Sequence, residues 1–485
     1  MEILDNDLKS IQEIRRLVER AKNAQEKLKN FSQEKIDEIV KSIAESAEAD
    51  AIRLAKLAED ETGFGKWQDK VLKNIFASKL VYNNLKNMKT VGIINVDEEK
   101  RITEVAVPVG VIAGLIPSTN PTSTTIYKTL IALKAGNAIV FSPHPTAKKS
   151  IIETAKMLSK AAIEAGAPEG IIGCATILSM QGTDELMKHK DVALILATGG
   201  EAMVKAAYSS GTPAIGVGPG NGPAFIEKSA DIKLAVKRII DSKTFDNGVI
   251  CASEQSIVVE ECMKEKIVDE LKKQGAYFLN KDESEKLGRF ILRANGTMNP
   301  QIVGKSVKVL AELSGLNIPE GTRIVISEQN TVGKQNPYSR EKLAPILAFY
   351  CEEDWEKACG RCIELLMNEG KGHTLIIHSN NEELIKEFLL KKPVSRLLVN
   401  TPGALGGIGG TTNLVPALTL GCGAVGGSAT SDNVGPMNLF NIRRLAYGVR
   451  ELEDLKDEKQ PIEVNNISEE YVEELIRSLL LKIKN

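Results

Sequence analysis

GVIAGLIPSTNPTSTTIYKTLIALKAGNAIVF, residues 110–141, is the stretch that decides the fold. It contains an apolar run at Val111 to Ile116, a helical segment from Thr125 to Lys134, and a second apolar run at Ala138 to Phe141. Short apolar runs bounded by turn residues are typical of strands buried on both faces. A strand, a helix and a second strand in this order predict a parallel βαβ unit within an open α/β sheet.

The alternation of strands and helices continues on both sides of this unit. A helix from Ala147 to Ala165 and a strand at Val192 to Ala197 extend the first series. A second series follows Pro223, with apolar runs and helical segments at residues 256–259, 263–274, 354–367, 374–377 and 397–399. We therefore predict the α/β class with two Rossmann-like open α/β domains, one made of residues 1–89 and 109–223 and the other of residues 224–436.

Bulk composition narrows the function to small-molecule chemistry. The 485 residues can bury two or three cores, and 62 basic against 64 acidic residues leave no electrostatic footprint for nucleic acid or an anionic membrane. The odd set of seven cysteines has no ladder or zinc-like spacing, so no metal is predicted. The segment Met1 to Lys9 lacks the apolar core of a signal peptide, and no apolar run is long enough to span a bilayer, so we expect a reducing cytoplasm.

The N-terminal part is predicted to be a helical layer followed by a hairpin. Residues 5–88 repeat apolar residues at helical spacing, as at Leu8, Ile11 and Ile14. The β-rich runs at residues 90–95 and 102–107 flank the charged turn Asp97-Glu98-Glu99-Lys100. A hairpin ahead of a new domain often pairs with another subunit.

The C-terminal part divides into three segments. Residues 403–436 are rich in glycine, which fits either close backbone approach to a ligand or a flexible surface loop. Residues 451–466 are polar, contain Pro461 and are predicted to be a linker. Ser468 can cap a final helix within residues 451–485. Its apolar positions form one stripe: Val472, Leu475, Ile476, Leu479, Leu480 and Ile483.

Two loops carry the residue types needed for thiol chemistry. Cys251 lies in the loop Phe245-Asp246-Asn247-Gly248-Val249-Ile250-Cys251-Ala252-Ser253, directly before a strand. A lone cysteine is more often a small buried hydrophobe than a nucleophile. Asn120, however, stands after a predicted strand and before a proline, and an amide there can donate to a developing oxyanion.

These two loops together resemble the catalytic loops of the aldehyde dehydrogenase superfamily, and the similarity extends over roughly residues 8 to 448. The resemblance implies that Cys251 is the catalytic thiol and Asn120 the oxyanion-binding residue. It also implies a fold of two Rossmann-like domains, with residues 1–89 and 109–223 as the nicotinamide-cofactor domain and residues 224–436 as the thiol domain. The hairpin at 90–108 and the segment 437–450 correspond to the oligomerisation elements, which implies a homodimer or homotetramer.

Cofactor residues follow from the same resemblance. The segment Lys134-Ala135-Gly136-Asn137-Ala138 is a further match in the cofactor domain. Ala197-Thr198-Gly199-Gly200 matches the turn that binds the cofactor's pyrophosphate, and Glu341 in Glu341-Lys342-Leu343-Ala344-Pro345 resembles the ribose-binding carboxylate. An ordinary βα turn and a solvated glutamate are the alternatives for these two. The implied cofactor-binding set is Ile116, Pro117, Ser118, Ser142, Pro143, Thr198, Gly199, Gly200 and Glu341.

One departure from the hydrolytic members of the aldehyde dehydrogenase superfamily predicts which molecule accepts the acyl group. Their Glu-Leu-Gly-Gly motif, whose glutamate activates water, is replaced by Gly216-Val217-Gly218-Pro219-Gly220-Asn221-Gly222-Pro223, which holds no proton acceptor. A thioester on Cys251 would then persist until a better nucleophile such as the thiol of coenzyme A arrives. Ser142-Pro143-His144-Pro145 stands where hydrolytic relatives have a lysine that binds the adenine ribose, so NAD and NADP both stay open.

The chain resembles the acylating subfamily more closely still, including the propionaldehyde and acetaldehyde dehydrogenases of bacterial microcompartments. The segments that carry this are residues 116–123, His373-Thr374 and residues 421–447. His373 is either a structural donor or a proton handler for the incoming thiol. The implied function is oxidation of a short-chain aldehyde to acyl-coenzyme A with reduction of NAD.

Two other functions remain alternatives at this stage. A reductase of acyl phosphates shares the fold and also lacks the glutamate, and a non-catalytic scaffold would use only the helical tail. The tail either docks on the protein's own core or, like an encapsulation peptide, binds shell or cargo proteins of a microcompartment.

Overall fold

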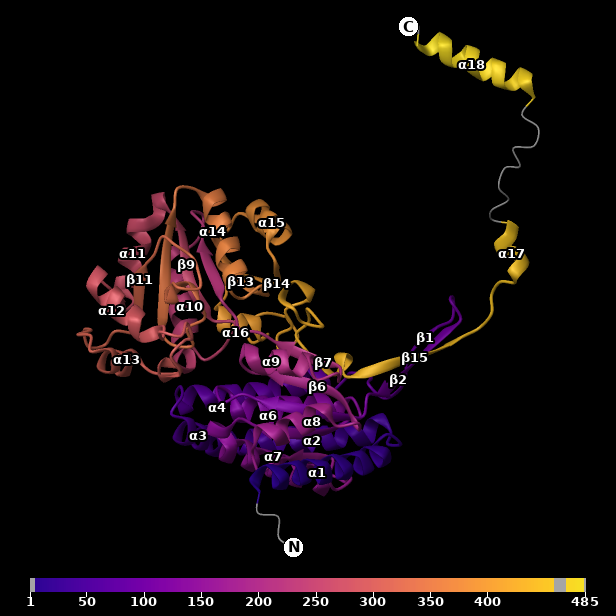
Figure 1. The fold of residues 1–485 in the computed structure, drawn as a ribbon, viewed down its shortest axis with the longest axis horizontal. Helices are drawn as coiled ribbons and strands as arrows, with labels where there is room; N and C mark the ends of the chain where they lie inside the picture. The colour runs from indigo at the N-terminus through magenta and orange to yellow at the C-terminus, as the bar shows by residue number, and fades with distance from the viewer. Residues whose placement is uncertain (1–4, 458–467, 484–485) are drawn as a thin grey trace. The chain divides into compact units, whose positions relative to one another are not determined.

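The computed structural model describes residues 5–457 and 468–483. Contacts divide the chain into two units, the first made of residues 1–94 and 106–442 and the second of residues 95–105 and 443–485. Figure 1 shows the elements of both units along the chain. The first unit carries both parallel sheets.

The first unit begins with the helical layer that the sequence predicts. Side-chain caps start the first two helices, because Asp5 accepts from the backbone N–H groups of Asp7 and Leu8, and Ser32 accepts from that of Lys35. The layer consists of α1 (Asn6–Leu28), α2 (Gln33–Ala49), α3 (Ala51–Thr62), α4 (Trp67–Ile75), the π turn η1 (Phe76–Leu80) and α5 (Val81–Leu85). Its apolar stripes pack on the first sheet and on α6 and α7, within one hydrophobic cluster.

The first sheet has five parallel strands in the order β5-β4-β3-β6-β7. The strands are β3 (Val111–Ile116), β4 (Ala138–Pro143), β5 (Ile172–Cys174), β6 (Val192–Thr198) and β7 (Ala214–Val217). The helices between them are α6 (Pro121–Lys134), α7 (Lys148–Glu164), α8 (Met180–Lys188) and α9 (Glu201–Tyr208), with a 3₁₀ turn η2 (Pro145–Ala147) before α7. The strand order reverses between β3 and β6, and the crevice at the carboxyl ends of such strands is where open α/β sheets bind ligands.

The second sheet has seven parallel strands in the order β10-β11-β12-β9-β8-β13-β14. The strands are β8 (Gly222–Ile226), β9 (Glu254–Glu260), β10 (Ala276–Phe278), β11 (Ile324–Glu328), β12 (Ile346–Glu352), β13 (Gly372–His378) and β14 (Val394–Val399). The α-helices are α10 (Ile232–Thr244), α11 (Lys264–Lys273), α12 (Lys281–Ile291), α13 (Val307–Ser314), α14 (Trp355–Asn368), α15 (Glu382–Lys391) and α16 (Gly403–Gly407). The 3₁₀ turns are η3 (Phe245–Gly248), η4 (Glu261–Met263), η5 (Pro300–Ile302), η6 (Pro337–Ser339), η7 (Ala424–Gly426) and η8 (Pro436–Asn438).

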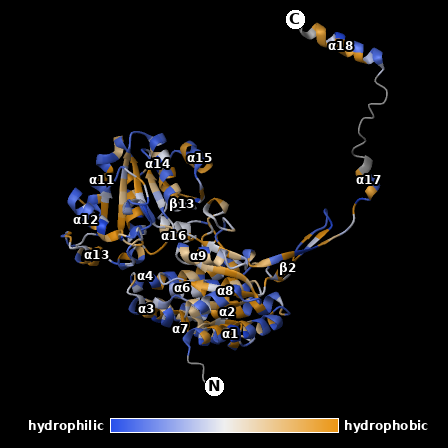
Figure 2. Ribbon diagram, in the orientation of Figure 1, coloured by the Kyte–Doolittle hydropathy of each residue, from blue (hydrophilic) through white to orange (hydrophobic). Residues whose placement is uncertain are grey.

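Both faces of this second sheet are covered, as its continuous apolar strands predict. Phe225 and Tyr350 belong to the hydrophobic cluster on one face, and their strand neighbours Ile226 and Phe349 belong to the cluster on the other. Figure 2 shows these strands as hydrophobic, with hydrophilic residues on the helices that cover them. The predicted α/β class with two open parallel sheets is therefore confirmed.

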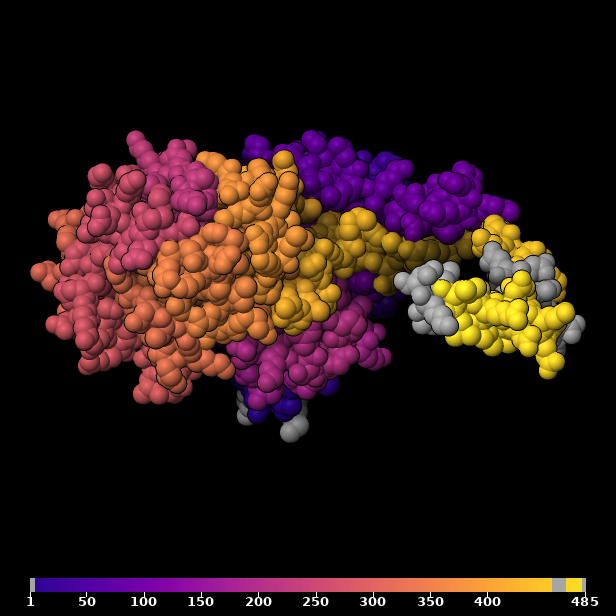
Figure 3. Space-filling view, turned by 90° about the horizontal axis from the view of Figure 1, so that it is seen from above, coloured from indigo at the N-terminus to yellow at the C-terminus, as the bar shows by residue number. Residues whose placement is uncertain are grey.

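The glycine-rich segment 403–436 is closely packed, because its glycines lie against both backbone and side-chain atoms of the protein. A Cβ on Gly421 would lie 2.3 Å from the Thr430 carbonyl oxygen, and a Cβ on Gly407 would lie 2.7 Å from the Ala252 Cβ. Figure 3 shows residues near 400 beside residues near 200 on one face of the first unit, and the Ser428 hydroxyl donates to the Gly216 carbonyl at 2.8 Å. Neither alternative describes these positions, because the close contacts of the segment are with the protein itself.

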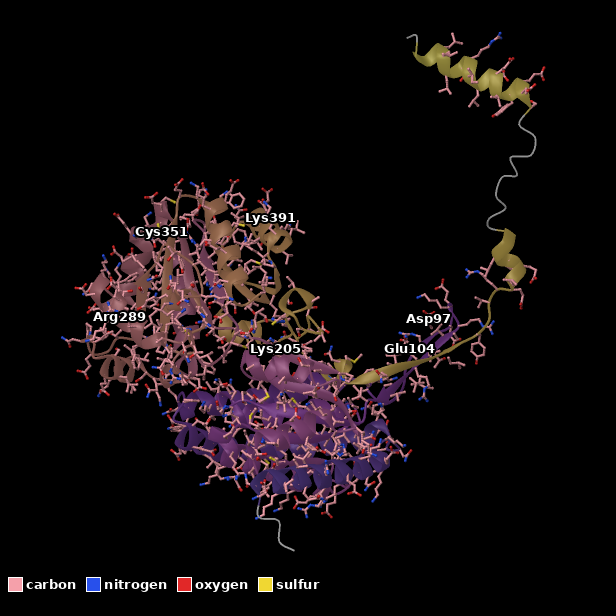
Figure 4. The ribbon with its side chains drawn as sticks, viewed as in Figure 1. Asp97, Glu104, Lys205, Arg289, Cys351 and Lys391 are labelled. Carbon is pink, nitrogen blue, oxygen red and sulfur yellow. The ribbon has the colours of Figure 1, made fainter. Side chains whose placement is uncertain are left out.

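The second unit contains most of a three-stranded sheet in the order β1-β2-β15, where the strands are β1 (Gly92–Asp97), β2 (Ile102–Pro108) and β15 (Phe440–Ala446). The Asp97 carboxylate accepts from the Lys100 backbone N–H at 2.8 Å, which closes the predicted hairpin turn. Figure 4 labels Asp97 and Glu104 on this hairpin, and Glu104 forms an ion pair with Arg444 of β15 at 2.9 Å.

Two helices follow the three-stranded sheet in the second unit. Residues 452–457 form the helix α17 (Leu452–Asp457) within the segment predicted to be a linker, and the linker role stays a prediction. The rest of the predicted linker lies mainly in residues 458–467, outside the described residues. In α18 (Glu469–Ile483) the Ser468 hydroxyl accepts from the Tyr471 backbone N–H at 3.3 Å, as predicted. Five residues of the predicted stripe are exposed: Val472, Leu475, Ile476, Leu479 and Leu480. The sixth, Ile483, is not among the side chains that the structure describes.

Within the described parts of the chain, no helix is long and apolar enough to cross a bilayer.

Candidate active site

A cavity of about 220 Å³ lies in the first unit at the carboxyl ends of β3 and β6, where the strand order reverses. Its walls come from the loop after β3, the β6–α9 turn, the loop after β7 and the loop before β9. The lining includes Pro117, Ser118, Thr119, Asn120, Thr124, His144, Thr198, Gly199, Gly200, Val217, Gly218, Pro219, Val249, Ile250, Cys251, Glu341, Leu343, Ile408, Leu418 and Leu420. Segments far apart in the sequence therefore meet at one site.

Cys251 enters this cavity from a tight, strained loop. The backbone of Asp246 and Asn247 has φ values of 48° and 52°, which is the left-handed region that favours glycine. Behind the thiol, a Cβ on Gly220 would lie 1.9 Å from the Cys251 carbonyl oxygen, so only glycine fits there. Burial raises the pKa of the Cys251 thiol to about 12, and the charge of Glu341 adds to this rise. The resting side chain is therefore a neutral thiol.

Asn120 lies beside this loop, at the N-cap of α6. Its side chain makes no capping hydrogen bond to the helix, so the amide is available for other contacts. The Nδ2 group donates to the Val249 carbonyl oxygen at 3.0 Å, and the Oδ1 atom accepts from the Lys73 ammonium at 2.7 Å. The structure thus brings an amide donor and the thiol of Cys251 into one cavity, as the sequence predicted.

The β6–α9 turn leaves space for a ligand with phosphate groups. Gly200 is the N-cap of α9, and a Cβ added to it would meet nothing within 4 Å. A Cβ on Gly199 would meet only the side chain of Met203. Free backbone N–H groups at a helix N-terminus attract anions, so this turn fits the pyrophosphate of a nicotinamide cofactor.

Glu341 lines the same cavity and is held by two backbone contacts. Its Oε1 atom accepts from the Gly220 N–H at 2.9 Å, and its own N–H donates to the Glu369 carboxylate at 2.6 Å. Burial raises the pKa of Glu341 to about 8, with a further contribution from the charge of Glu369. At neutral pH part of this carboxyl population is therefore protonated, and the ionised form is a stronger base than an ordinary carboxylate.

Four of the residues predicted for the site are absent from the lining of this cavity. Ile116 and Pro143 are buried at the ends of their strands, and Ser142 bonds to the Thr183 hydroxyl at 3.0 Å. His373 is fully buried on β13 with its Nδ1 atom 2.9 Å from the Thr374 hydroxyl. Burial lowers its pKa to about 3, so this imidazole is neutral. Either Nδ1 or the Thr374 hydroxyl can be the donor in this contact, so both roles predicted for His373 stay predictions.

The sequence prediction missed other residues of the site. Exposed His144 and the apolar Ile408, Leu418 and Leu420 also line the cavity. No local pattern predicted that these residues would reach it, because they come from separate loops. Among the described residues, no group of three or more His, Cys, Asp or Glu side chains could hold a metal ion.

The match to a family model decides the family. Residues 3–340 match the model described as "Aldehyde dehydrogenase family". The chain belongs to the aldehyde dehydrogenase family. As in the prediction for that family, the cavity joins one thiol, one amide and an open glycine turn.

Several aldehyde dehydrogenases are similar to this chain. The bifunctional aldehyde-alcohol dehydrogenase AdhE of Escherichia coli K12 is 45% identical over 90% of the chain, which spans 50% of that relative. The crystal structure of a probable aldehyde dehydrogenase from Listeria monocytogenes is 66% identical, with a TM-score of 0.92 over 93% of this chain and 100% of that one. The acetylating aldehyde dehydrogenase of Geobacillus thermoglucosidasius is 54% identical, with a TM-score of 0.91 over 93% and 99%. A propionaldehyde dehydrogenase from a bacterial microcompartment of Clostridium phytofermentans is 28% identical, with a TM-score of 0.81 over 90% and 97%.

Proposed function

We propose that this chain oxidises a short-chain aldehyde and transfers the acyl group to coenzyme A. One observation carries the proposal: Cys251 and Asn120 line a single cavity whose wall at Val217, Gly218 and Pro219 offers no base for water. The similarity to the acetylating aldehyde dehydrogenase of Geobacillus thermoglucosidasius supports the acyl transfer. The chain spans about half the length of the curated aldehyde-alcohol dehydrogenases that it matches, so the activity is proposed for this part alone.

The residues of the cavity fit a nicotinamide cofactor. The open turn at Gly199 and Gly200 would hold the pyrophosphate, and Glu341 would bind a ribose hydroxyl. When bound, the oxidised cofactor supplies an acceptor for a hydride. His144 lines the cavity and no carboxylate stands beside it in residues 142–147, so we expect both NAD and NADP to be accepted.

Cys251 and Asn120 divide the chemistry between them. The Cys251 thiol passes its proton to solvent water, and its sulfur bonds to the aldehyde carbon while the carbonyl electron pair moves to oxygen. The Asn120 amide and the Cys251 backbone N–H donate to that oxygen. Loss of a hydride from the same carbon leaves a thioester on Cys251. The thiolate of coenzyme A then attacks the thioester carbon, the bond to Cys251 breaks, and Cys251 departs as the thiolate.

Water competes poorly for this thioester. The stretch from Gly216 to Pro223 resembles the position of the hydrolytic Glu-Leu-Gly-Gly motif, and its residues on the cavity wall, Val217, Gly218 and Pro219, cannot accept a proton from water. A thiol is also intrinsically more reactive toward a thioester than water is. The apolar walls at Ile408, Leu418 and Leu420 fit an aliphatic aldehyde, and the resemblance to the acylating subfamily supports a short chain.

The test is an assay of NADH and NADPH formation with acetaldehyde, propionaldehyde and butyraldehyde, with and without coenzyme A. We expect turnover to require coenzyme A. Cys251→Ala should abolish it, while Cys262→Ala, at an exposed free cysteine, should retain it. Equal turnover with inorganic phosphate in place of coenzyme A would favour an acyl-phosphate reductase, and no turnover with any acceptor would favour a scaffold.

We also propose partners for the second unit. The hairpin of β1 and β2 with β15 supports a homodimer or homotetramer, because the two edge strands, β1 and β15, are largely exposed. In α18 the exposed apolar side chains Val472, Leu475, Ile476, Leu479 and Leu480 form a stripe that would bind shell or cargo proteins of a microcompartment. Deletion of residues 457–485 should leave activity intact but disperse the enzyme in cells. Unchanged co-localisation with shells would argue against this role.

A further inference from the structure

A group of buried charges lies behind Asn120. Lys70 and Lys73 of α4 both donate to the Oδ2 atom of Asp246, Lys70 at a distance of 3.0 Å. The side chains of the three residues are 3%, 2% and 0% exposed. Two ammonium groups and one carboxylate are expensive to bury, and hydrophobic side chains of the same size would be the cheaper way to fill this space. The cluster therefore calls for a reason beyond stability.

Lys73 fixes the orientation of the Asn120 amide. Its Nζ atom donates to the Asn120 Oδ1 atom at 2.7 Å. An ammonium group can only donate, so the amide must turn its oxygen toward Lys73 and its N–H groups away from it. The Nδ2 group then donates to the Val249 carbonyl oxygen at 3.0 Å, on the side of the loop that carries Cys251, and to the Thr119 hydroxyl at 3.3 Å. A flipped amide would place its oxygen against an oxyanion.

Asp246 connects the same cluster to the thiol loop. Its Oδ1 atom accepts from the Lys66 backbone N–H at 2.7 Å, and its own N–H donates to the Asp69 carboxylate at 2.8 Å. The left-handed backbone at Asp246 and Asn247 is thus held from the side of α4. The cluster of Lys70, Lys73 and Asp246 therefore contacts both Asn120, the proposed oxyanion donor, and the loop that carries Cys251.

We propose that Lys73 is a positioning residue for acyl transfer, which holds the Asn120 N–H toward Cys251 and polarises it by its charge, while Lys70 only braces the cluster. The inference rests on the roles proposed above for Cys251 and Asn120. Lys73 itself touches neither substrate nor cofactor, because Asn120 stands between it and the cavity.

Polarisation follows from the charge on Lys73. A hydrogen bond from an ammonium group to the amide oxygen draws electron density from the amide nitrogen, so its N–H groups become stronger donors. Burial lowers the pKa of Lys73 to about 8, opposed by the charge of Asp246, so the ammonium form still dominates at pH 7. Lys70 instead donates to the Thr119 backbone carbonyl at 3.3 Å, and therefore does not act on the amide.

The difference between the two lysines gives a matched pair of variants, Lys73→Met and Lys70→Met. Each removes one ammonium group from the same carboxylate, but only the first leaves Asn120 Oδ1 without its donor. Lys79→Met, which breaks an exposed ion pair with Glu48, is the outside control. Thermal unfolding would measure the stability of each full-length variant.

The rate of acylation by p-nitrophenyl acetate tests the inference without cofactor or coenzyme A. The Cys251 sulfur bonds to the ester carbon, an oxyanion forms, and p-nitrophenolate leaves as the carbonyl is restored. Alkylation by iodoacetamide is the comparison, because the sulfur displaces iodide from carbon and no oxyanion forms. Cys251→Ala identifies the part of each reaction that belongs to Cys251.

We expect Lys73→Met to slow the acylation burst by at least about tenfold, which is less than the roughly 100-fold loss of the donor itself in Asn120→Ala. The rate of alkylation by iodoacetamide should change by less than about threefold in both Lys73→Met and Asn120→Ala. Lys70→Met should slow acylation less than Lys73→Met does, even where the two lose similar stability. Lys73→Arg should recover part of the rate because it keeps a charged donor. In the Asn120→Ala background, Lys73→Met should have no further effect.

Several results would overturn the inference. They are equal losses of acylation in the two lysine variants, additive effects of Lys73→Met and Asn120→Ala, or parallel losses of acylation and alkylation. Should Lys73→Met fail to fold, Lys73→Gln and Lys73→Arg carry the same comparison. A wild-type chain without acylation at Cys251 would remove the roles on which the inference depends. A chain that acylates normally but ignores coenzyme A would refute only the proposed function.

Discussion

The substitution Gly220→Ala tests whether the position of the thiol loop controls the reaction. A Cβ on this residue would lie 1.9 Å from the Cys251 carbonyl oxygen, 2.8 Å from its carbonyl carbon and 3.3 Å from its Cβ. Real Cβ atoms essentially never come within 3.0 Å of another heavy atom, so the two segments must separate by about 1 Å at this contact. The atom that has to move is the backbone carbonyl oxygen of Cys251, the proposed nucleophile.

A shift of this size is large for catalysis. Misplacement of a reacting group by about 1 Å can cost on the order of 100-fold in rate, which corresponds to about 2.7 kcal/mol in the activation barrier. We therefore expect Gly220→Ala to lower kcat for aldehyde oxidation by about 100-fold, with a smaller effect on the KM of the cofactor. Steady-state kinetics with saturating coenzyme A would measure both constants.

A matched glycine separates this effect from a general cost of alanine. Gly360 lies on the exposed face of α14, where a Cβ would meet nothing within 4 Å, so Gly360→Ala should keep full activity. It should also raise stability by up to about 1 kcal/mol because alanine favours the helix. A Gly220→Ala enzyme that stays folded and within about threefold of the wild-type kcat would refute the reasoning.

Three further outcomes are expected. Initial rates with aldehyde and coenzyme A as the varied substrates should give parallel double-reciprocal lines, because the acyl group waits on Cys251, and intersecting lines would contradict that order. Iodoacetamide alkylation of Cys251 should rise about tenfold per pH unit between pH 7 and 9, since its thiol pKa is raised to about 12 and the thiolate is a minor species throughout, whereas a plateau near pH 7 would show a lowered pKa. Glu341→Gln should raise the KM for NAD about tenfold if its carboxyl binds a ribose hydroxyl, and an unchanged KM would exclude that role.

The sequence predicted the parallel sheets, and it predicted that the Cys251 thiol and the Asn120 amide lie together. The continuous apolar run at Val111 to Ile116 predicted a strand that is indeed buried on both faces, and the order of elements predicted parallel pairing. Cys251 and Asn120 share a cavity as the resemblance implied. The strands β5, β7, β8, β10, β11 and β12 were not predicted. Of these, β5 and β10 have three residues each, and segments this short carry no periodic signal.

Other features depend on tertiary contacts that no local pattern carries. Lys70 and Lys73 have the spacing of a solvated helix face. In the structure both are buried and form ion pairs with Asp246, which lies far away in the sequence. His373 stands before an apolar run and could have reached a cavity, but its strand is covered on both faces. The glycines near residue 420 have the composition of a flexible loop, and only the close approach of Thr430 shows why glycine is needed.

The fate of the acyl group on Cys251 tests the central claim most directly. Purified enzyme would be mixed with propionaldehyde and NAD in the absence of coenzyme A, and both the intact mass of the protein and the free propionate would be followed over time. We expect one NADH per site and a propionyl adduct that is lost on addition of coenzyme A and absent in Cys251→Ala. Continuous formation of free propionate at the full rate, with no adduct on the protein, would contradict the account.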